Sequence, residues 1–496
     1  MNSVSAQLEA LAPLCIVALA TLLLVMLDAI ATSNAEDARE NELGVFKGTF
    51  LSLVAGAALL LAMLSAAYHF EYTLVAVVTP ASMMKVDGAA SFAMMLLCAG
   101  ALLTVWYSLA YLPAMNMHHG EFYPLLLFSV AGALAVVCAS NLISLFVAIE
   151  LMSLPVYALA GFDRDRSQSS EAGLRALLMG AFASAISLYG IALIYGATGH
   201  FDYSGLGDPV TGTSPLALAG FALLLVGLLT KLGAAPFHAW LPDSATGAPT
   251  VVASMFQTLV LCASAFALVR VIDAISPKAL PGFVDIMMIA GAASMLVGSV
   301  MALAQDNVRR MLAYAAVAHA GFLLCAIAIP TAAGRGAAFL HVATFVFIQL
   351  GAWGAVSAVA DRGVELEKLS DYEGLAQRRP ILAAAATIFL LALAGMPGTA
   401  GFISRLVVMS STVGAGHIAL TVLMGAASVV LFAAYLRVPT AMYMGRTDKP
   451  QDQIPPLPAV FALIVCAFLT IYFGLFPGEG PMLFNLLEMV GRASQS

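Results

Sequence analysis

Charged residues are scarce in this sequence. Only 10% of its 496 residues are Asp, Glu, Lys or Arg, whereas a soluble domain typically has about 25%. Hydrophobic residues make up 61% of the chain, and they are gathered in long runs. This composition excludes an ordinary soluble fold and predicts an all-α polytopic membrane protein. The net charge of −7 is spread over the polar connections, which indicates no nucleic-acid partner.

Redox and metal-binding motifs are also lacking. The six cysteines all lie in apolar runs and none belongs to a C-x-x-C pair, so no disulfide framework, zinc site or iron–sulfur cluster is indicated. We therefore expect no cofactor-binding or metal site here, and any electron transfer in another chain. No Lys or Arg precedes the first apolar run. This argues against a cleaved signal peptide and for a retained first span.

Apolar runs of membrane-spanning length recur from one end of the sequence to the other. We count about fourteen, at residues 10–30, 50–68, 90–111, 122–138, 141–160, 172–199, 214–243, 250–270, 283–304, 308–330, 336–360, 381–412, 416–444 and 457–476. Twelve Lys and Arg residues lie in odd-numbered connections and five in even-numbered connections or tails. By the positive-inside rule, the odd connections face the cytoplasm and both termini face the outside.

Two of the runs contain helix-breaking residues beside a positive charge. In 214–243, Lys231 is followed by Pro236, and in 381–412, Pro397 is followed by Arg405. These are the seventh and twelfth spans, so an offset of five predicts two inverted five-helix repeats, helices 4–8 and 9–13. Paired interruptions of this kind indicate an ion site. The corresponding division of the chain is 1–120, 121–272, 273–445 and 446–496.

Lys231 and Glu150 are the strongest candidates for ion transfer. A lysine at bilayer depth costs roughly 2.5–3.5 kcal/mol on insertion scales, so such a residue is rarely without a function. Glu150 lies near the middle of the fifth run and is the natural partner of Lys231. Pairing favours the charged forms of both groups, and separating them lets the lysine release its proton. The alternative for Glu150 is a protonated, hydrogen-bonded structural residue.

Other polar residues in the spans have weaker signals. His319 and His341 titrate in a range that suits proton relay, although a single helix histidine is as often structural. Arg405 retains its proton and suits anchoring of charge rather than proton transfer. His238, in the first break, is interpreted mainly as a residue that caps backbone groups. Gln257 gives the eighth span a polar face.

Asp243, at the polar end of the first broken span, is interpreted as a cap or turn residue.

Four stretches together carry a resemblance to a known family. They read FVAIELMSLPVYAL, TKLGAAPFHAWLPDSATGAPT, DNVRRMLAYAAVAHAGFLL and DYEGLAQRRPILAAAATIFLLALAGMPGTAGFISR. The sequence resembles the subunit N family of the bacterial proton-pumping NADH:quinone oxidoreductase, respiratory complex I, whose membrane subunits are antiporter-like. The resemblance implies proton translocation driven by quinone reduction in neighbouring subunits. It also implies NADH, FMN, iron–sulfur clusters and a quinone elsewhere in the complex, and other membrane subunits and lipid as partners.

Individual positions follow from this resemblance. Glu150 matches the family's helix-five glutamate and Lys231 its helix-seven lysine, whereas Arg405 stands in place of a helix-twelve lysine. Leu261 stands where a helix-eight lysine is expected, so two titratable amines are missing beyond Lys231. Gln257 lies one turn away on the same face and can hold water. The departures leave open a scaffold without transport, and the fold alone also suits a multi-subunit cation/proton antiporter or a hydrogenase-type redox complex.

Overall fold

Helices form nearly all of the described chain, as the apolar runs predict. The structure is a computed structural model, and it describes residues 4–33, 40–72, 77–79, 83–117, 120–206, 214–275, 282–360, 364–446 and 457–476. Within these ranges, twelve helical stretches are long and apolar enough to cross a membrane. Three shorter apolar helices accompany them: Phe122–Cys138, Pro380–Ala394 and Ala400–Gly414. The predicted all-α polytopic class is confirmed. Residues 477–496, part of the expected C-terminal segment, lie outside the described residues.

The helices follow one another with short connections. The first group is α1 (Val4–Ala10), α2 (Ala12–Ser33), α3 (Glu40–Tyr72) and α4 (Gly88–Ala114). The second is α5 (Phe122–Cys138), α6 (Leu142–Ala160), α7 (Ser167–Thr198), α8 (Tyr203–Leu206), α9 (Pro215–Leu232), α10 (Trp240–Gly247), α11 (Thr250–Met255), the π-helical η3 (Phe256–Val260) and α12 (Leu261–Ala274). The third is α13 (Phe283–Leu303), α14 (Val308–Ala328), α15 (Ala332–Val359), the 3₁₀-helical η4 (Leu369–Tyr372), α16 (Leu375–Arg378), α17 (Pro380–Ala394), α18 (Ala400–Gly414), α19 (Ile418–Met444) and α20 (Leu457–Leu475).

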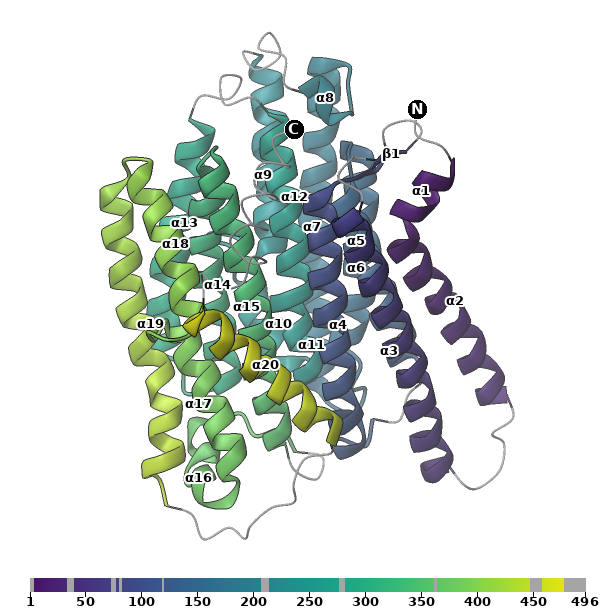
Figure 1. The fold of residues 1–496 in the computed structure, drawn as a ribbon, viewed down its shortest axis with the longest axis vertical. Coiled ribbons are helices and arrows are strands. Elements are labelled where there is room, and N and C mark those ends of the chain that lie inside the picture. The colour runs from purple at the N-terminus through teal and green to yellow at the C-terminus, as the bar shows by residue number, and fades with distance from the viewer. Residues whose placement is uncertain are drawn as a thin grey trace.

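The ends of the bundle differ in their connections. Strands β1 (Val77–Val78) and β2 (Lys85–Val86) pair antiparallel between α3 and α4. Figure 1 shows β1 and α8 at one end and α16 at the other. We call these the β1 end and the α16 end. In the numbering of the predicted spans, β1 and α8 lie in even-numbered connections. Helix α16 lies in an odd-numbered connection.

Both predicted helix breaks are present and share their local chemistry. Helix α9 ends at Gly233 and α17 ends at Gly395, and both glycines adopt the left-handed conformation, with φ of 73° and 83°. Glycine is favoured at this position because it lacks the Cβ that opposes positive φ. Pro236 and Pro397 follow, and neither can restore the helical hydrogen-bond pattern. Each break therefore leaves carbonyl groups at the end of the preceding helix without helical partners.

Close glycine contacts hold the broken helix α9 against α7. A Cβ atom added at Gly190 of α7 would lie 2.6 Å from the carbonyl oxygen of Gly220, and one added at Gly220 would lie 2.8 Å from that of Gly190. Small residues permit such approach of helices inside a membrane, where packing rather than the hydrophobic effect drives association. This contact fixes the distance between α7 and the helix that carries Lys231.

The outer helices present large apolar side chains. Leu22 of α2, Leu178 of α7 and Val429 of α19 are each at least 60% exposed, whereas every residue of α14 except Arg310 is buried. Helix α20 crosses the bundle obliquely (Figure 1) and packs on α4, α15 and α18. Apolar surface of this extent is typical of a protein surrounded by lipid and partner helices.

Gly190→Ala is expected to destabilise the chain by about 1–3 kcal/mol, because the new methyl group forces α7 and α9 apart. Gly196→Ala, on the same helix, is the matched control, since its Cβ would meet only the Leu216 side chain at 3.8 Å. Thermal unfolding of the two variants in detergent measures the difference. Equal midpoints would show that the glycine contact does not limit the packing.

Candidate functional site

Lys231 lies in the last turn of α9, immediately before the first break, and only 5% of its side chain is exposed. Its Nζ atom donates hydrogen bonds to Tyr157 Oη at 2.8 Å and to Ser153 Oγ at 3.1 Å. The ammonium also lies 5.3 Å from the centre of the Tyr157 ring. Two hydroxyls therefore replace part of the hydration shell of this buried charge.

Glu150 completes the surroundings of this amine. Its Oε1 atom lies 3.8 Å from Lys231 Nζ, and Ser184 of α7 donates a hydrogen bond to the same oxygen. Glu150, Ser153 and Tyr157 have i, i+3 and i+7 spacing, which places them on one face of α6. The expected pair is thus brought together. Ser153, Tyr157 and Ser184 were missed by sequence reasoning, although the helical spacing from Glu150 identifies the first two.

Glu150 lies closer to the outside of the bundle than Lys231. Its side chain is 26% exposed. A cavity of about 10 Å³, close to the volume that one water needs, is lined by Glu150, Ser184, Ser187 and Lys231 together with apolar residues. The carboxylate is therefore placed between the surface of α6 and α7 and the enclosed amine.

His319 of α14 and His341 of α15 form a second polar group. His319 Nδ1 lies 3.4 Å from His341 Nε2, within hydrogen-bond distance, and the two rings stack with centres 5.4 Å apart. His319 Nε2 lies 3.4 Å from an Nη atom of Arg405. The three side chains form a continuous row, Arg405–His319–His341, although they come from three different helices.

Arg405 also binds the end of the broken helix α17. Its guanidinium donates to the carbonyl of Ala394 at 2.6 Å and to the carbonyl of Leu393, and it lies over the Phe322 ring at 5.2 Å. A Cβ atom at Gly395 would lie 3.0 Å from an Nη atom of Arg405, so glycine also makes room for the guanidinium. Arg405 thus satisfies carbonyls that the break leaves without helical partners.

Gln257 lies in the π-helical turn η3, and such turns are frequent at functional sites. Its Oε1 atom accepts hydrogen bonds from Gln349 Nε2 at 2.5 Å and from Trp353 Nε1 at 3.1 Å. Gln257 Nε2 and Gln349 Oε1 are buried without a partner in the described structure. Two unpaired polar atoms of opposite type suit a bound water. Leu261, at the expected lysine position, begins α12 and is buried among apolar residues.

The candidate residues therefore form three groups. Among the residues that the structure describes, no hydrogen bond or ion pair connects the Glu150–Lys231 group, the Gln257 group and the Arg405–His319–His341 row. Pro236 and Pro397 lie in the two breaks as predicted. His238 lies beside Pro236 with its ring 6.4 Å from that of Tyr314. Its buried Nδ1 has no hydrogen-bond partner within the described ranges.

Asp243 was interpreted wrongly as a cap or turn residue. It lies inside α10 and pairs with Arg175 at 2.9 Å and with Arg310 at 2.8 Å. Its carboxylate therefore connects α7, α10 and α14 at the α16 end. A polar residue next to a proline was misleading because the ion-pair partners are distant in sequence.

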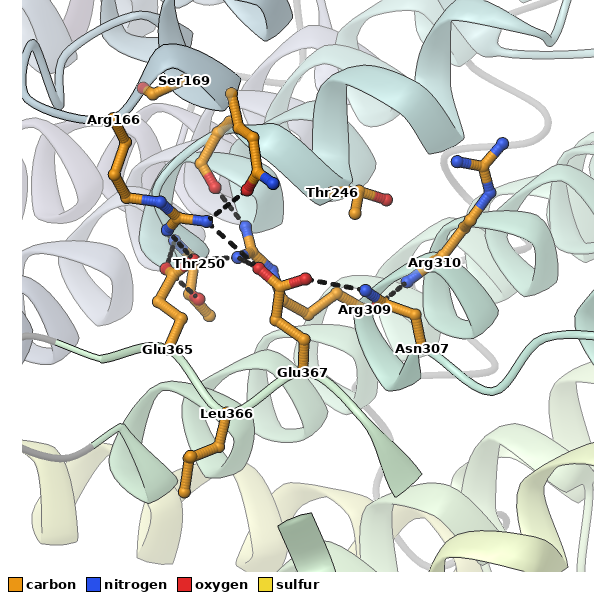
Figure 2. A network of polar contacts seen from close by, with 12 residues as sticks. Arg166, Ser169, Thr246, Thr250, Asn307, Arg309, Arg310, Glu365, Leu366 and Glu367 are labelled. Atoms are coloured by element: carbon orange, nitrogen blue, oxygen red, sulfur yellow. Dashed lines mark hydrogen bonds and ion pairs between the residues drawn. The ribbon is translucent and has the colours of Figure 1, made fainter. Parts of the chain in front are cut away.

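A larger ionic network at the α16 end was also missed. The network brings together a residue just before α7, one in the first turn of α14 and two between α15 and η4: Arg166, Arg309, Glu365 and Glu367 (Figure 2). Glu365 Oε2 accepts from Arg166 Nη1 at 2.5 Å and also pairs with Arg309. Glu365 Oε1 accepts from the hydroxyl of Tyr111. Loop charges such as these normally indicate a solvated surface, so the sequence contains no clear signal of the network.

Glu365 remains ionised although its side chain is only 3% exposed. Burial by itself raises the pKa of a carboxyl group, but the Arg309 charge and the hydrogen bonds from Tyr111, Arg166 and Thr250 outweigh it and lower the pKa of Glu365 to about 2. The opposite charges and donors thus hold this carboxylate in its charged form.

The β1 end contains a cavity with a volume of about 650 Å³. Its charged lining residues are Lys85, Asp202, Arg270, Asp273 and Arg335. Both arginines are paired: Arg270 binds Asp87 at 2.8 Å, and Arg335 binds Asp273. The cavity is large and polar enough to hold many waters.

Together the fold and these side chains define a class: a multi-pass membrane protein with buried charges beside two broken helices. The family model described as "NADH:quinone oxidoreductase/Mrp antiporter, TM" matches residues 139–431. The chain belongs to this family, and the resemblance inferred from its motifs is confirmed.

Relatives and solved structures agree with this assignment. A Sorangium cellulosum protein named NADH-quinone oxidoreductase subunit N 1 is 36% identical, over 94% of this chain and 96% of that protein. A chain of Thermus thermophilus respiratory complex I with bound aureothin is 30% identical with a TM-score of 0.79, covering 94% of this chain and 98% of that chain. A chain of the Mrp complex of Dietzia has a TM-score of 0.83 at 21% identity, covering 98% and 97%, which shows a shared fold.

Glu365→Gln is expected to lower stability in detergent at pH 7 by on the order of 3 kcal/mol, because the folded chain favours the charged form of this carboxyl group. The stabilisation is fully present above the unfolded pKa, about 4.5, and is lost as the pH falls toward the folded value of about 2. Unfolding midpoints of the original chain and the variant should therefore approach each other below about pH 4. A constant difference across this range would exclude the carboxylate charge as its source.

Proposed function

We propose that this chain is a proton-translocating membrane subunit of an NADH:quinone oxidoreductase, driven by quinone reduction in neighbouring subunits. The single observation that carries the proposal is the buried Lys231 ammonium, held by Glu150, Ser153 and Tyr157 beside a helix break. NADH, FMN, iron–sulfur clusters and quinone are assigned to other subunits, and the partners are antiporter-like and small membrane subunits. The name of the Sorangium cellulosum relative supports this activity.

The Lys231 group provides a switch for one proton. While Glu150 is charged and 3.8 Å away, it stabilises the ammonium form of Lys231. A charge change or a shift of α6 that weakens the pair makes the buried ammonium less favourable, and Nζ then donates its proton to water. Ser153 and Tyr157 keep the neutral amine in place through their hydroxyls.

The Arg405–His319–His341 row has a different role. A neutral histidine accepts a proton at one ring nitrogen and releases one from the other, so the hydrogen-bonded pair His319–His341 is suited to proton transfer. Arg405 retains its proton. It positions His319, supplies fixed positive charge and holds the end of α17. A water between Gln257 and Gln349 replaces the missing lysine at Leu261, and the cavity at the β1 end provides an aqueous route to the periplasm.

We further propose fourteen spans in two inverted repeats, with both termini periplasmic in a bacterial inner membrane and boundaries at 1–120, 121–272, 273–445 and 446–496. Comparison of the second helices of the repeats, α6 and α14, supports this. Met152 of α6 faces Gly132 of α5, and Ala318 of α14 faces Gly298 of α13, in both cases at backbone contact distance.

The next residue in each helix contacts the cation of the broken helix. In α6 this is Ser153, bound to Lys231, and in α14 it is His319, bound to Arg405. An aromatic ring one turn further on lies beside each cation, from Tyr157 and Phe322 respectively. Ser153 and His319 thus occupy equivalent positions in the two halves, as a repeated unit predicts, whereas the two rings lie four and three residues further along their helices.

Lys231→Met and Glu150→Gln are each expected to lower proton pumping, and the double variant to be no worse than Lys231→Met, because the two residues act as a pair. Acidification of inside-out vesicles per NADH oxidised measures the effect, and NADH oxidation with an artificial acceptor checks assembly. Thr230→Val is the control, since the Thr230 hydroxyl bonds only to its own helix, at Val226. Pumping by Lys231→Met at the original ratio would exclude the proposed role.

Arg405→Met is expected to lower pumping more than Arg405→Lys, because lysine keeps the charge but lacks the planar fork that spans two carbonyls. Ser404→Ala is the neighbouring control, since its hydroxyl bonds only to Gly401 of the same helix. The same vesicle measurement applies. If Arg405→Lys raised pumping while Arg405→Met left it unchanged, the anchoring role would be wrong.

A further inference from the structure

The connection between α10 and α11 is held by an ion pair from outside it. Arg309 Nη2 donates to the carbonyls of Ala245, at 3.0 Å, and Ala248. These groups belong to the end of α10 and the residue that follows it. On the other side of Pro249, Glu365 accepts from Thr250 N at 3.0 Å and from Thr250 Oγ1 at 2.7 Å. Arg309 and Glu365 bind each other (Figure 2).

The charges match the helix ends that they contact. Carbonyls at a helix C-terminus have no helical partner and favour a cation, whereas amides at an N-terminus favour an anion. Arg309 supplies the cation to α10 and Glu365 supplies the anion to α11. One ion pair therefore replaces the backbone hydrogen bonds that are missing where these two helices separate.

Burial makes this arrangement specific. The Arg309 side chain is 0% exposed and that of Glu365 is 3% exposed. Charges this deeply buried must keep their partners, because a charge without a partner costs several kcal/mol. Tyr111 and Arg166 occupy further sites on Glu365. The connection therefore has little freedom to move unless the ion pair moves with it.

The pair also links the two halves of the protein. Arg309 lies in the first turn of α14, which carries His319 ten residues later. Glu365 lies between α15, which carries His341, and η4. Thr250 begins the helix that reaches Gln257 after seven residues, roughly 10 Å along its axis. Lys231 lies on the other side, at the end of α9. A shift of α14 or α15 is thus transmitted to the segment between Lys231 and Gln257.

We propose that Arg309 and Glu365 are positioning residues that fix the connection between α10 and α11, and thereby set Gln257 relative to Lys231 for proton transfer between the two halves. This inference rests on the proposed function of Lys231. It assigns no proton to the pair, which acts through the helices that it holds.

The experiment uses the intact complex in inside-out vesicles, with protons pumped per NADH oxidised as the readout. Glu365→Gln is expected to lose pumping to the same extent as Lys231→Met, within about twofold. Glu367→Gln is the matched control. Glu367 lies two residues away and meets both arginines at 3.2 Å, but it does not contact Thr250, so its substitution should leave the ratio near the original value.

A milder pair of variants keeps the test valid if Glu365→Gln does not assemble. Thr250→Val removes one hydrogen bond to Glu365 without changing a charge, and Thr250→Ser restores it. Lower pumping in Thr250→Val and recovery in Thr250→Ser would support the inference, because loss of stability alone lowers the amount of complex rather than its proton-to-electron ratio.

Two outcomes would overturn the proposal. One is an equal loss in Glu365→Gln and Glu367→Gln, which would make the effect one of net charge. The other is an unchanged ratio in assembled Glu365→Gln or in Thr250→Val. Lys231→Met in the same series distinguishes failure of the proposed function from failure of the positioning role. If Lys231→Met pumps normally, the proposed function is wrong. If only the Glu365 and Thr250 variants pump normally, the positioning role alone is wrong.

Discussion

A charge inside this bundle requires partners within the protein, because lipid and apolar side chains supply none. Lys231 meets this requirement with two hydroxyls, an aromatic ring and Glu150. Arg405 meets it with the carbonyls of a broken helix, and Arg309 with the carbonyls of another helix end and the carboxylate of Glu365. The helix breaks are thus connected to the charges. Arg405 and Arg309 bind backbone carbonyls that a helix end leaves without helical partners, whereas Lys231 lies beside its break and binds side-chain hydroxyls.

The sequence predicted the parts of this arrangement that depend on local pattern. Apolar runs located the helices, glycine and proline located both breaks, and the spacing of Glu150 within an apolar run identified the partner of Lys231. The ionic network could not be predicted in the same way. Glu365 lies 56 residues from Arg309 in the chain, in a short polar connection whose charges have the same pattern as a solvated loop. Asp243 was misinterpreted for the same reason, since Arg175 and Arg310 approach it only in the folded chain.

The two halves differ in chemistry at the equivalent helix positions of Ser153 and His319. Where the first half has Lys231 on Ser153, the second has Arg405 on His319. In the Lys231–Ser153 contact, the group that can titrate is the lysine of the broken helix. In the Arg405–His319 contact, it is the histidine of the neighbouring helix, α14. The substitution of arginine for the family's lysine therefore need not remove proton transfer from the second half. Under the proposed function, the group that titrates in the second half is His319 rather than the cation that it contacts, Arg405. His341 adds a second titratable group beside His319.

This difference bears on how the halves communicate. A fixed arginine charge cannot be turned off, so under the proposed function the second half does not signal by neutralising Arg405, as the first half does with Lys231. Communication by charge must then run through the histidines or through water near Gln257, where Leu261 offers no titratable group. Communication by position has a defined route, because α14 and α15 are tied through Arg309 and Glu365 to the connection beside Lys231. Under the proposed positioning role, this mechanical link connects the two halves without the two amines that the family resemblance leads one to expect at Leu261 and Arg405.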